Sequence, residues 1–143
     1  TNKWFETQDS ISYWDDFSKQ KIVWGEISDK PKFAIDNCGK YYVEATTFFM
    51  TGDHLIYLMH FLNSSLSKYF FAQLGTTTGV GTTRWKKFKL ELFPIPKPNE
   101  LEPDTINILS SNNYNINDID DIIFSIYSFT PEEIDAILEF DNK

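Results

Sequence analysis

Three prolines at alternate positions constrain this chain more than any other feature of its sequence. Pro94, Pro96 and Pro98 fall within the stretch FPIPKP. Because proline fixes φ and has no backbone N–H, neither a helix nor a central strand can run through this stretch. We expect an extended, polyproline-like segment that separates a first region, residues 1–98, from a second region, residues 99–143.

The two regions differ in charge. Residues 1–98 contain 12 Lys and Arg against 10 Asp and Glu, a net of +2, whereas residues 99–143 contain Lys143 against 11 acids, a net of -10. The formal net charge of the whole chain, -8 at pH 7, would by itself argue against a polyanionic partner. Because this average hides the asymmetry, we expect the two regions to have different electrostatic roles.

Before Gly52 the sequence of the first region predicts short strands. Runs rich in β-branched and aromatic residues alternate with turn residues, a pattern that is typical of a small antiparallel sheet. Asn37 to Gly39 would form the turn of a hairpin between two of these runs. The predicted strands are residues 21–27, 32–36, 40–44 and 46–51.

After Gly52 the hydrophobic spacing becomes that of a helix, with apolar residues at i, i+3, i+4 and i+7. The spacing predicts a helix from an N-cap at Asp53 to Leu74, kinked near residues 63–65. Its apolar side would pack against the sheet. The residues that set the spacing are Leu55, Leu58, Met59 and Leu62.

The second region is helical in character. An apolar stripe in residues 115–129 is followed by a second helix signal, with Thr130 as N-cap, Pro131 at the first helical position and Glu133 at the capping-box position. The sequence as a whole predicts an α+β fold, in which a small mixed, mainly antiparallel sheet packs on a helix pair and an acidic helical C-terminal extension follows. The stripe consists of Ile119, Ile122, Ile123 and Ile126.

The sequence contains none of the residue patterns that we searched for as signs of a catalytic site. A single cysteine, Cys38, allows no internal disulfide, and the two histidines, His54 and His60, lack the spacing of zinc ligands. No nucleophile motif and no nucleotide-binding glycine loop is present. Paired carboxylates such as Asp15 and Asp16 are more often solvated or capping residues than a general acid and base. We expect no catalytic centre and no bound cofactor in this chain.

No stretch is suited to crossing a membrane. The longest apolar run, residues 55–62, is interrupted by His60 and is far shorter than the roughly 18 to 20 residues that a spanning helix needs. The first ten residues show neither the basic nor the apolar part of a secretory signal. With a single cysteine, the chain is expected in the cytoplasm and without a membrane partner.

The most basic stretch of the chain follows a run of Gly and Thr. Residues 75–83 contain only Gly, Thr and one Val, and residues 75–98 as a whole have a local net charge of +4. The spacing of Trp85, Phe88 and Leu92 predicts a short helix with an apolar side and a basic side.

The chemistry of this stretch suits DNA. Hydroxyls and backbone N–H groups contact phosphates, lysines supply charge and arginine reads guanine edges. Two lysines in the loop after the first strand would extend the same face. Surface lysine clusters are common, however, and a Gly/Thr run also serves as a plain linker. The candidate DNA-binding residues are Lys30, Lys32, Thr82, Thr83, Arg84, Lys86, Lys87 and Lys89.

Four segments in a fixed order favour the DNA hypothesis. The first is the Lys-Ile-x-x-x-Glu-Ile strand at residues 21–27, followed by a Phe-Ala-x-Asp strand and a Gly-Lys-Tyr-Tyr turn. The second is the helix with Leu-Asn-Ser at 62–64 and an aromatic second half. The third is the Phe-Pro-Ile-Pro exit at 93–96, and the fourth is IDDIIFSIYSFTPEEI at 119–134. In this order the chain resembles the TaqI-like C-terminal specificity domain of adenine-specific DNA methyltransferases and of fused type IIG restriction-modification enzymes.

The resemblance extends from Trp4 to Phe140 and implies a target-recognition domain. In such enzymes a separate domain, outside this chain, binds S-adenosylmethionine and methylates adenine after flipping the base from the duplex. This chain would choose the sequence, with double-stranded DNA and that methyltransferase domain as its partners. Phe93, Phe124 and Phe129 depart from the residues usual in the family, and these changes are core-like.

The acidic extension allows two interpretations. In a recognition enzyme it would dock on the methyltransferase domain, leaving Ile122, Ile126 and Phe129 as an apolar patch unless the first region buries them. Alternatively, the chain is a non-catalytic interaction module whose acidic helical tail binds a basic protein. Binding to DNA measured at several salt concentrations distinguishes the two interpretations, because phosphate contacts make DNA affinity fall steeply with salt concentration. The absence of a nucleophile and of an acid–base pair disfavours a stand-alone enzyme.

Overall fold

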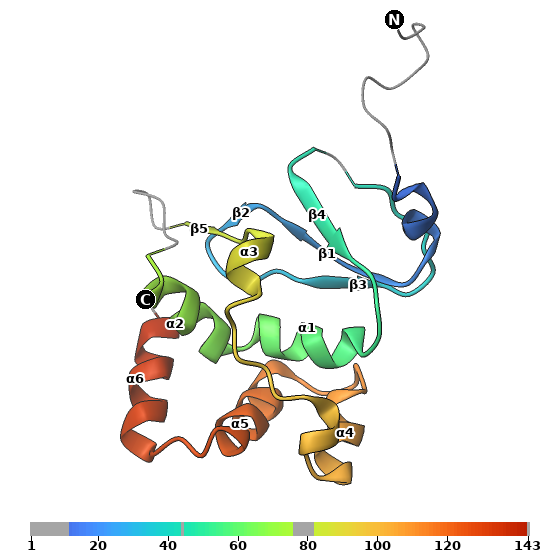
Figure 1. The fold of residues 1–143 in the computed structure, drawn as a ribbon. Helices are drawn as coiled ribbons and strands as arrows, with labels where there is room; N and C mark the ends of the chain where they lie inside the picture. The colour runs from blue at the N-terminus through green and yellow to red at the C-terminus, as the bar shows by residue number, and fades with distance from the viewer. Residues whose placement is uncertain (1–11, 44, 76–81, 143) are drawn as a thin grey trace, which may run out of the picture.

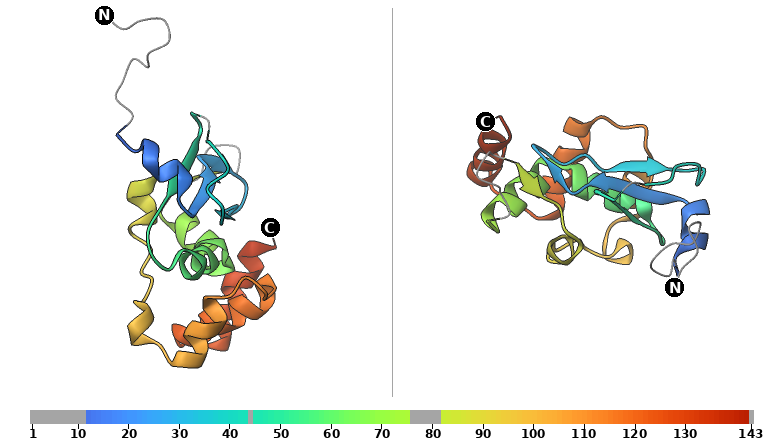
Figure 2. Two further views of the ribbon diagram at one scale, coloured as in Figure 1. Left: turned by 90° about the vertical axis from the view of Figure 1, so that its right-hand side faces the viewer. Right: turned by 90° about the horizontal axis from the view of Figure 1, so that it is seen from above.

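The structure, a computed structural model, describes residues 12–43, 45–75 and 82–142. Figure 1 shows the strands in an upper layer, a layer of helices beneath them and the C-terminal helices at the bottom. The side view in Figure 2 shows the same order of layers. The α+β class predicted from the sequence is confirmed.

A three-stranded sheet is centred on β1 (Lys21–Gly25). It pairs antiparallel with β3 (Ala34–Asp36) on one side and with β4 (Thr47–Met50) on the other. Further along the chain, β2 (Ile27–Ser28) pairs antiparallel with β5 (Thr83–Arg84) to form a separate two-stranded ribbon. The strands are antiparallel as predicted but shorter than predicted.

The hairpin predicted across Asn37 to Gly39 is wrong. Its second strand, residues 40–44, is not a strand where the structure describes it, and residue 44 lies outside the described residues. The Asp36 carboxylate instead accepts hydrogen bonds from three backbone N–H groups of the turn, so these donors are withheld from a β ladder. The donors belong to Cys38, Lys40 and Tyr41, at 3.1, 3.4 and 3.1 Å.

A buried ion pair fixes this turn to the neighbouring strand. Lys21 Nζ donates to Asp36 Oδ2 at 2.6 Å, and the two side chains are 0% and 3% exposed. Lys21 Nζ also donates to the Phe17 carbonyl at 2.8 Å. The hydrogen bond from Lys21 holds the pKa of Asp36 well below its usual range. Because both charges are satisfied by hydrogen bonds, the cost of removing them from water is offset.

The long helix predicted after the sheet is divided into α1 (Leu55–Asn63) and α2 (Ser65–Gln73). The break falls at Ser64, whose ψ of 158° is extended. Ser64 Oγ then accepts a hydrogen bond from the N–H of Ser67 and so caps α2. The predicted kink near residues 63–65 is confirmed.

The N-cap predicted at Asp53 is wrong. His54 occupies that position with a left-handed φ of 57°, and its side chain makes no capping hydrogen bond. Gly52 has a φ of 140°. The chain therefore turns into α1 through Gly52 and His54, which leaves Asp53 outside the helix.

Residues 94–97 form neither helix nor strand, as predicted, but the 3₁₀ helix η2 (Pro98–Glu100) begins at the last of the three prolines, and three α-helices follow it. The capping box is confirmed, because Thr130 Oγ1 accepts from the Glu133 N–H at 3.3 Å and a Glu133 carboxylate oxygen accepts from the Thr130 N–H at 2.8 Å. The first of these helices was not predicted. The three helices are α4 (Pro103–Leu109), α5 (Ile116–Ile126) and α6 (Pro131–Asp141).

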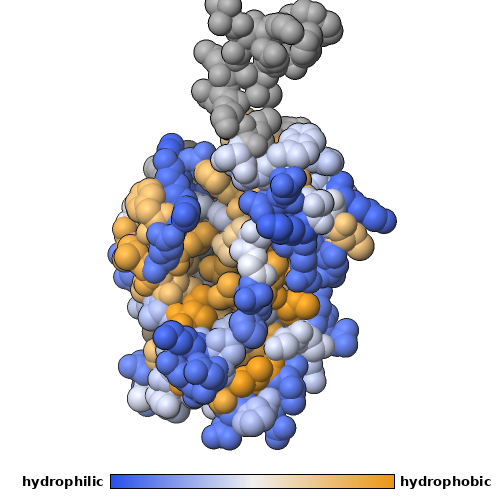
Figure 3. All heavy atoms as spheres, turned by 45° about the vertical axis from the view of Figure 1, so that its right-hand side comes forward, coloured by the Kyte–Doolittle hydropathy of each residue, from blue (hydrophilic) through white to orange (hydrophobic). Residues whose placement is uncertain are grey.

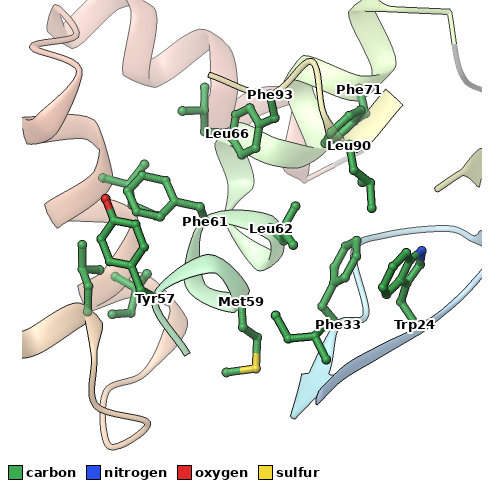
Figure 4. Packing of buried hydrophobic residues seen from close by; sticks show 14 of the residues in the cluster. Trp24, Phe33, Tyr57, Met59, Phe61, Leu62, Leu66, Phe71, Leu90 and Phe93 are labelled. Carbon is green, nitrogen blue, oxygen red and sulfur yellow. The ribbon is translucent and has the colours of Figure 1, made fainter. Parts of the chain in front are cut away.

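One hydrophobic cluster joins the layers. It includes Trp24 and Phe33 at the strands and Phe61 and Leu62 of α1 (Figure 4), together with Ile123 of α5. The apolar stripe of the acidic extension thus has a partner within this chain. Ile122, Ile126 and Phe129, the residues considered for an apolar patch, are half-buried and pack against the cluster.

A polar contact ties α5 to the first turn of α2. Asp120 is 5% exposed and accepts hydrogen bonds from the N–H and the Oγ of Ser65, at 3.0 and 2.5 Å. Burial raises the pKa of Asp120. Close by, Lys68 Nζ lies 3.0 Å from the carboxylate of Asp141 in α6. The acidic extension is thus joined to α2 by polar contacts as well as by apolar packing.

Replacing Lys21 with Met is expected to lower the free energy of unfolding by about 3 kcal/mol at pH 7, because the Asp36 carboxylate would stay buried without its counter-charge. Lys32→Met is the matched control, since it removes an exposed pair with Asp29 and should change stability much less. Denaturant unfolding measures both, and equal losses would contradict the role assigned to the buried pair.

The difference in stability between the native protein and Lys21→Met also depends on pH. Because the folded-state pKa of Asp36 lies below its usual range, the pair stabilises the fold at every pH above the unfolded-state pKa of about 3.9. Its contribution is lost as the pH falls from there through the folded-state pKa. The gap in stability between the native protein and Lys21→Met should therefore be smaller at pH 3 than at pH 7.

Candidate nucleic-acid interface

Two tryptophans anchor the ribbon of β2 and β5 to the core. The indole N–H of Trp85 donates to Ser28 Oγ at 2.9 Å, and the indole N–H of Trp24 donates to the Trp85 carbonyl at 2.8 Å. The backbone N–H of Trp85 donates to the Glu26 carbonyl at 2.8 Å. Because Trp85 is only 2% exposed, a buried side chain holds this very short pair of strands in place.

Side chains alternate between core and solvent along β5. Thr83 and Trp85 are buried, whereas the side chains of Arg84 and Lys86 are 52% and 41% exposed. The helix predicted from the spacing of Trp85, Phe88 and Leu92 is therefore wrong in its first part. The extended path prevails because it lets Trp85 bond to residues almost 60 positions earlier, which local spacing does not reveal.

The apolar side predicted for that helix is wrong as well. Only α3 (Lys87–Leu90) is helical, and its inward-facing residue is Leu90, which is 8% exposed. Phe88 and Leu92 are 60% and 58% exposed instead. The lysines of α3 nevertheless lie at the surface, beside the ribbon (Figure 1).

A carboxylate that the sequence analysis did not single out lies among the cations. Glu26 Oε1 is 3.9 Å from Arg84 Nη1 and 3.7 Å from Lys86 Nζ. Lys87 Nζ has a separate neighbour, the carboxylate of Glu91, at 3.8 Å. These distances exceed those of hydrogen bonds. The three cations are therefore only loosely paired and can exchange these partners for an incoming anion at small cost.

The other candidate lysines lie in the loop between β2 and β3. Lys30 and Lys32 line a polar cleft of about 470 Å³ together with Lys68 and Asp141. Lys32 Nζ donates to Asp29 Oδ1 at 2.8 Å, and this hydrogen bond lowers the pKa of Asp29. The structure thus groups these lysines with α2 and the end of α6, where an acidic side chain is also present.

The two groups of cations extend from opposite ends of the ribbon, because Trp85, next to Lys86, bonds to Glu26, whereas the lysine loop begins after Ser28. Ser28, which precedes the lysine loop, pairs with Thr83. Thr82 is half-buried and leads into β5 at this same end, whereas the Thr83 side chain is buried and supports the ribbon. Most of the Gly/Thr run, residues 76–81, lies outside the described residues.

No metal centre or membrane segment accompanies these cations in the part of the chain that the structure describes. Its His, Cys, Asp and Glu side chains form no group of three that could hold a metal ion. None of its helices is long and apolar enough to cross a membrane. The exposed Arg84 and lysine side chains are suited to binding an anion.

The fold and the site together define a small α+β domain that presents cationic side chains from a ribbon fixed to its core. Residues 1–95 of the 143 match the family model of the TaqI-like C-terminal specificity domain, and the chain belongs to this family. The matched residues include the sheet, α1, α2, the ribbon and α3. No curated protein matches the chain. As a specificity domain of restriction-modification enzymes, it has a role in target recognition.

Replacing Trp85 with Phe is expected to lower the free energy of unfolding by about 1 to 2 kcal/mol. The phenyl ring keeps most of the burial but loses the hydrogen bond to Ser28. Trp14→Phe is the control, because Trp14 is 59% exposed and its replacement should cost less than about 0.5 kcal/mol. Thermal unfolding measures both, and similar losses would show that Trp85 does not anchor the ribbon.

Proposed function

We propose that this chain is the DNA sequence-recognition domain of a restriction-modification enzyme, and that it positions duplex DNA for adenine methylation by domains outside this chain. The observation that carries the proposal is the ribbon, which holds Arg84 and Lys86 at the surface through the buried Trp85 between them. Membership in a family of specificity domains makes DNA the expected ligand.

The ribbon suits a role in groove recognition. Two-stranded ribbons are among the elements that enter a DNA groove, and arginine is the side chain that most often reads guanine there. Because Arg84 projects from a strand whose neighbours are buried, little backbone freedom is lost when it binds. We assign Arg84 to base contact, and Lys86, Lys87 and Lys89 to phosphates.

In the same proposal, Glu26 helps the domain to distinguish specific from non-specific DNA. Its carboxylate neutralises part of the charge of Arg84 and Lys86, at 3.9 and 3.7 Å, so DNA phosphates must displace it. Non-specific binding is thereby weakened, whereas a correctly placed guanine compensates Arg84 through its own acceptors. A carboxylate in this position raises the ratio of specific to non-specific affinity.

The remaining expectations belong to this proposal too. A methyltransferase domain of the same parent protein, with S-adenosylmethionine as its cofactor, docks on the acidic extension. The acidic side chains of α6 such as Glu132, Asp135 and Glu139 are exposed and are available for that contact. The parent protein acts in the cytoplasm, where its DNA is found.

The first test is fluorescence anisotropy with duplex DNA of random sequence at several salt concentrations. Changing Lys86, Lys87 and Lys89 together to Ala should weaken binding to every sequence and lower the salt slope by about 1 per lysine. The control changes Lys19, Lys40 and Lys97, which alters the net charge equally, and it should retain most of the affinity. A folded native domain that binds no DNA at low salt would overturn the proposal in favour of the interaction module.

Arg84→Ala should behave differently from the lysine variant. With a selected target sequence in hand, it should reduce the preference for the target by about tenfold or more, while affinity for random DNA falls less. Competition between target and random duplexes measures this preference. If the arginine and lysine variants lose specific and non-specific binding in the same proportion, the assigned division of roles is wrong.

Glu26→Gln should raise affinity for random DNA by about threefold at low salt, because the carboxylate no longer competes with phosphate. Glu102→Gln is the control, since this exposed side chain at the start of α4 makes no capping hydrogen bond. An equal gain in the control would reduce the effect of Glu26 to net charge alone.

A further inference from the structure

The outer edge of β4 is open. The sheet order is β3-β1-β4, so β4 is an edge strand, and no strand among the described residues pairs with its outer side. The pairing with β1 fixes which backbone groups face outward. Glu26 N–H donates to the carbonyl of Thr46 at 3.0 Å, and opposite residues of antiparallel strands alternate between bonded and non-bonded pairs. Thr47 and Phe49 therefore turn their N–H and C=O groups away from β1.

This edge lacks the features that usually prevent strand addition. Edge strands are commonly protected by lysine, by proline or by a charge that points inward. Residues 45–51, ATTFFMT, contain no charged residue and no proline. All four residues of β4 are half-buried, so the side chains are partly packed while the backbone edge remains available.

A cleft lies on each face of this edge. On the Phe49 face, a cleft of about 540 Å³ is lined by Tyr13, Phe17 and Val43, and the rings of Phe17 and Phe49 are 5.0 Å apart. Tyr13 is 50% exposed and its ring lies 6.1 Å from that of Phe49.

On the Phe48 face, a cleft of about 480 Å³ is lined by Trp24, Leu58 and Leu90. The ring of Phe48 stacks on Trp24 at 5.7 Å. The surface view in Figure 3 shows apolar side chains gathered in the middle of one face of the molecule, between hydrophilic rims. Successive residues of an added strand point to opposite faces, so neighbouring side chains of one strand would enter the two clefts.

The walls and charges of these clefts define the occupant. The 3₁₀ helix η1 (Trp14–Ser18) flanks one cleft and α3 flanks the other. The charged residues at the rims occur as neighbours of opposite sign and leave no net charge there, with Lys19 Nζ 2.6 Å from Asp16 Oδ1 and Lys87 Nζ 3.8 Å from Glu91 Oε1. An uncharged segment fits such a surface better than an acidic or a basic one.

We propose that the β4 edge binds one extended, uncharged segment of a partner protein as an added antiparallel or parallel strand, with large apolar side chains at neighbouring positions. Backbone hydrogen bonds to Thr47 and Phe49 supply the register, and the two clefts select the side chains. This interaction surface uses no residue of the ribbon of β2 and β5, although Lys87 of α3 lines one of its clefts, and it does not depend on the DNA-recognition function.

The test uses the full chain and two blocked synthetic peptides, KTVFIVTK as the probe and KTEGEGTK as the control probe. Thr47→Pro removes one outward N–H while leaving both clefts intact, and proline is tolerated at the first residue of an edge strand. Thr47→Val is the matched control, because it keeps the N–H. KTVFIVTK should bind the native chain and Thr47→Val alike and bind Thr47→Pro about tenfold more weakly. KTEGEGTK should not bind.

Two further measurements on the same samples complete the design. Chemical-shift changes of the native chain on adding KTVFIVTK should centre on the amides of Thr47 and Phe49, and circular dichroism should confirm that Thr47→Pro is folded. DNA affinity should be the same for all three proteins, which separates this surface from the ribbon. Shift changes remote from β4, absence of binding to the native chain, or dimers in sedimentation that Thr47→Pro dissociates would each overturn the proposal.

Discussion

The hydrogen bond from the Trp24 indole to the Trp85 carbonyl holds the functional half of this domain together. It joins β1, at the centre of the sheet, to a segment 61 residues later in the chain, at a distance of 2.8 Å. Strands of two residues are too short to persist by themselves. Because Trp85 also packs its ring against Phe33 and Phe71, at 5.7 and 5.1 Å, the ribbon shares the stability of the main core. Arg84 and Lys86 acquire fixed positions only through this anchor.

A second constraint joins the acidic extension to the rest. The Asp120 carboxylate binds the N–H and hydroxyl of Ser65 at the first turn of α2, where a negative charge is also favoured by the helix dipole. One of the eleven acids of the second region is thus used inside the protein, and most of its neighbours remain at the surface. The extension behaves as part of the fold on its inner side and as a strongly charged surface on its outer side.

The sequence predicted those features whose causes are local. Three prolines excluded regular structure at residues 94–97, and Thr130 with Glu133 identified the start of α6, because caps depend on residues three positions apart. The break at Ser64 also follows from a short polar run. The cap predicted at Asp53 failed because the chain turns into α1 through Gly52 and His54, whereas two other failures depended on distant partners. Asp36 takes the N–H groups of a predicted hairpin because Lys21 secures it, and Trp85 draws a predicted helix into a strand.

The candidate site divides in the same way. Residue chemistry identified the cations, and the alternation of Thr83, Arg84, Trp85 and Lys86 was available as a period-2 signal but is too short to outweigh helical spacing. The proximity of Glu26 to Arg84 could not be read from the sequence, because it follows from the pairing of Ile27 with Arg84. The grouping of Lys30 and Lys32 with Asp141 likewise exists only in the folded chain.

The break at Ser64 sets a limit on how this domain can change in evolution. It lets one continuous stretch of chain serve two layers, since α1 packs under the sheet while α2 contacts the C-terminal helices. One residue added or removed there would shift the register of α2, in which successive residues lie about 100° apart around the helix axis. Ser65 would then turn away from Asp120, and the apolar side of α2 would leave its partners. Surface residues can diversify freely with a changing DNA target, whereas the number of residues between the two layers has to be conserved.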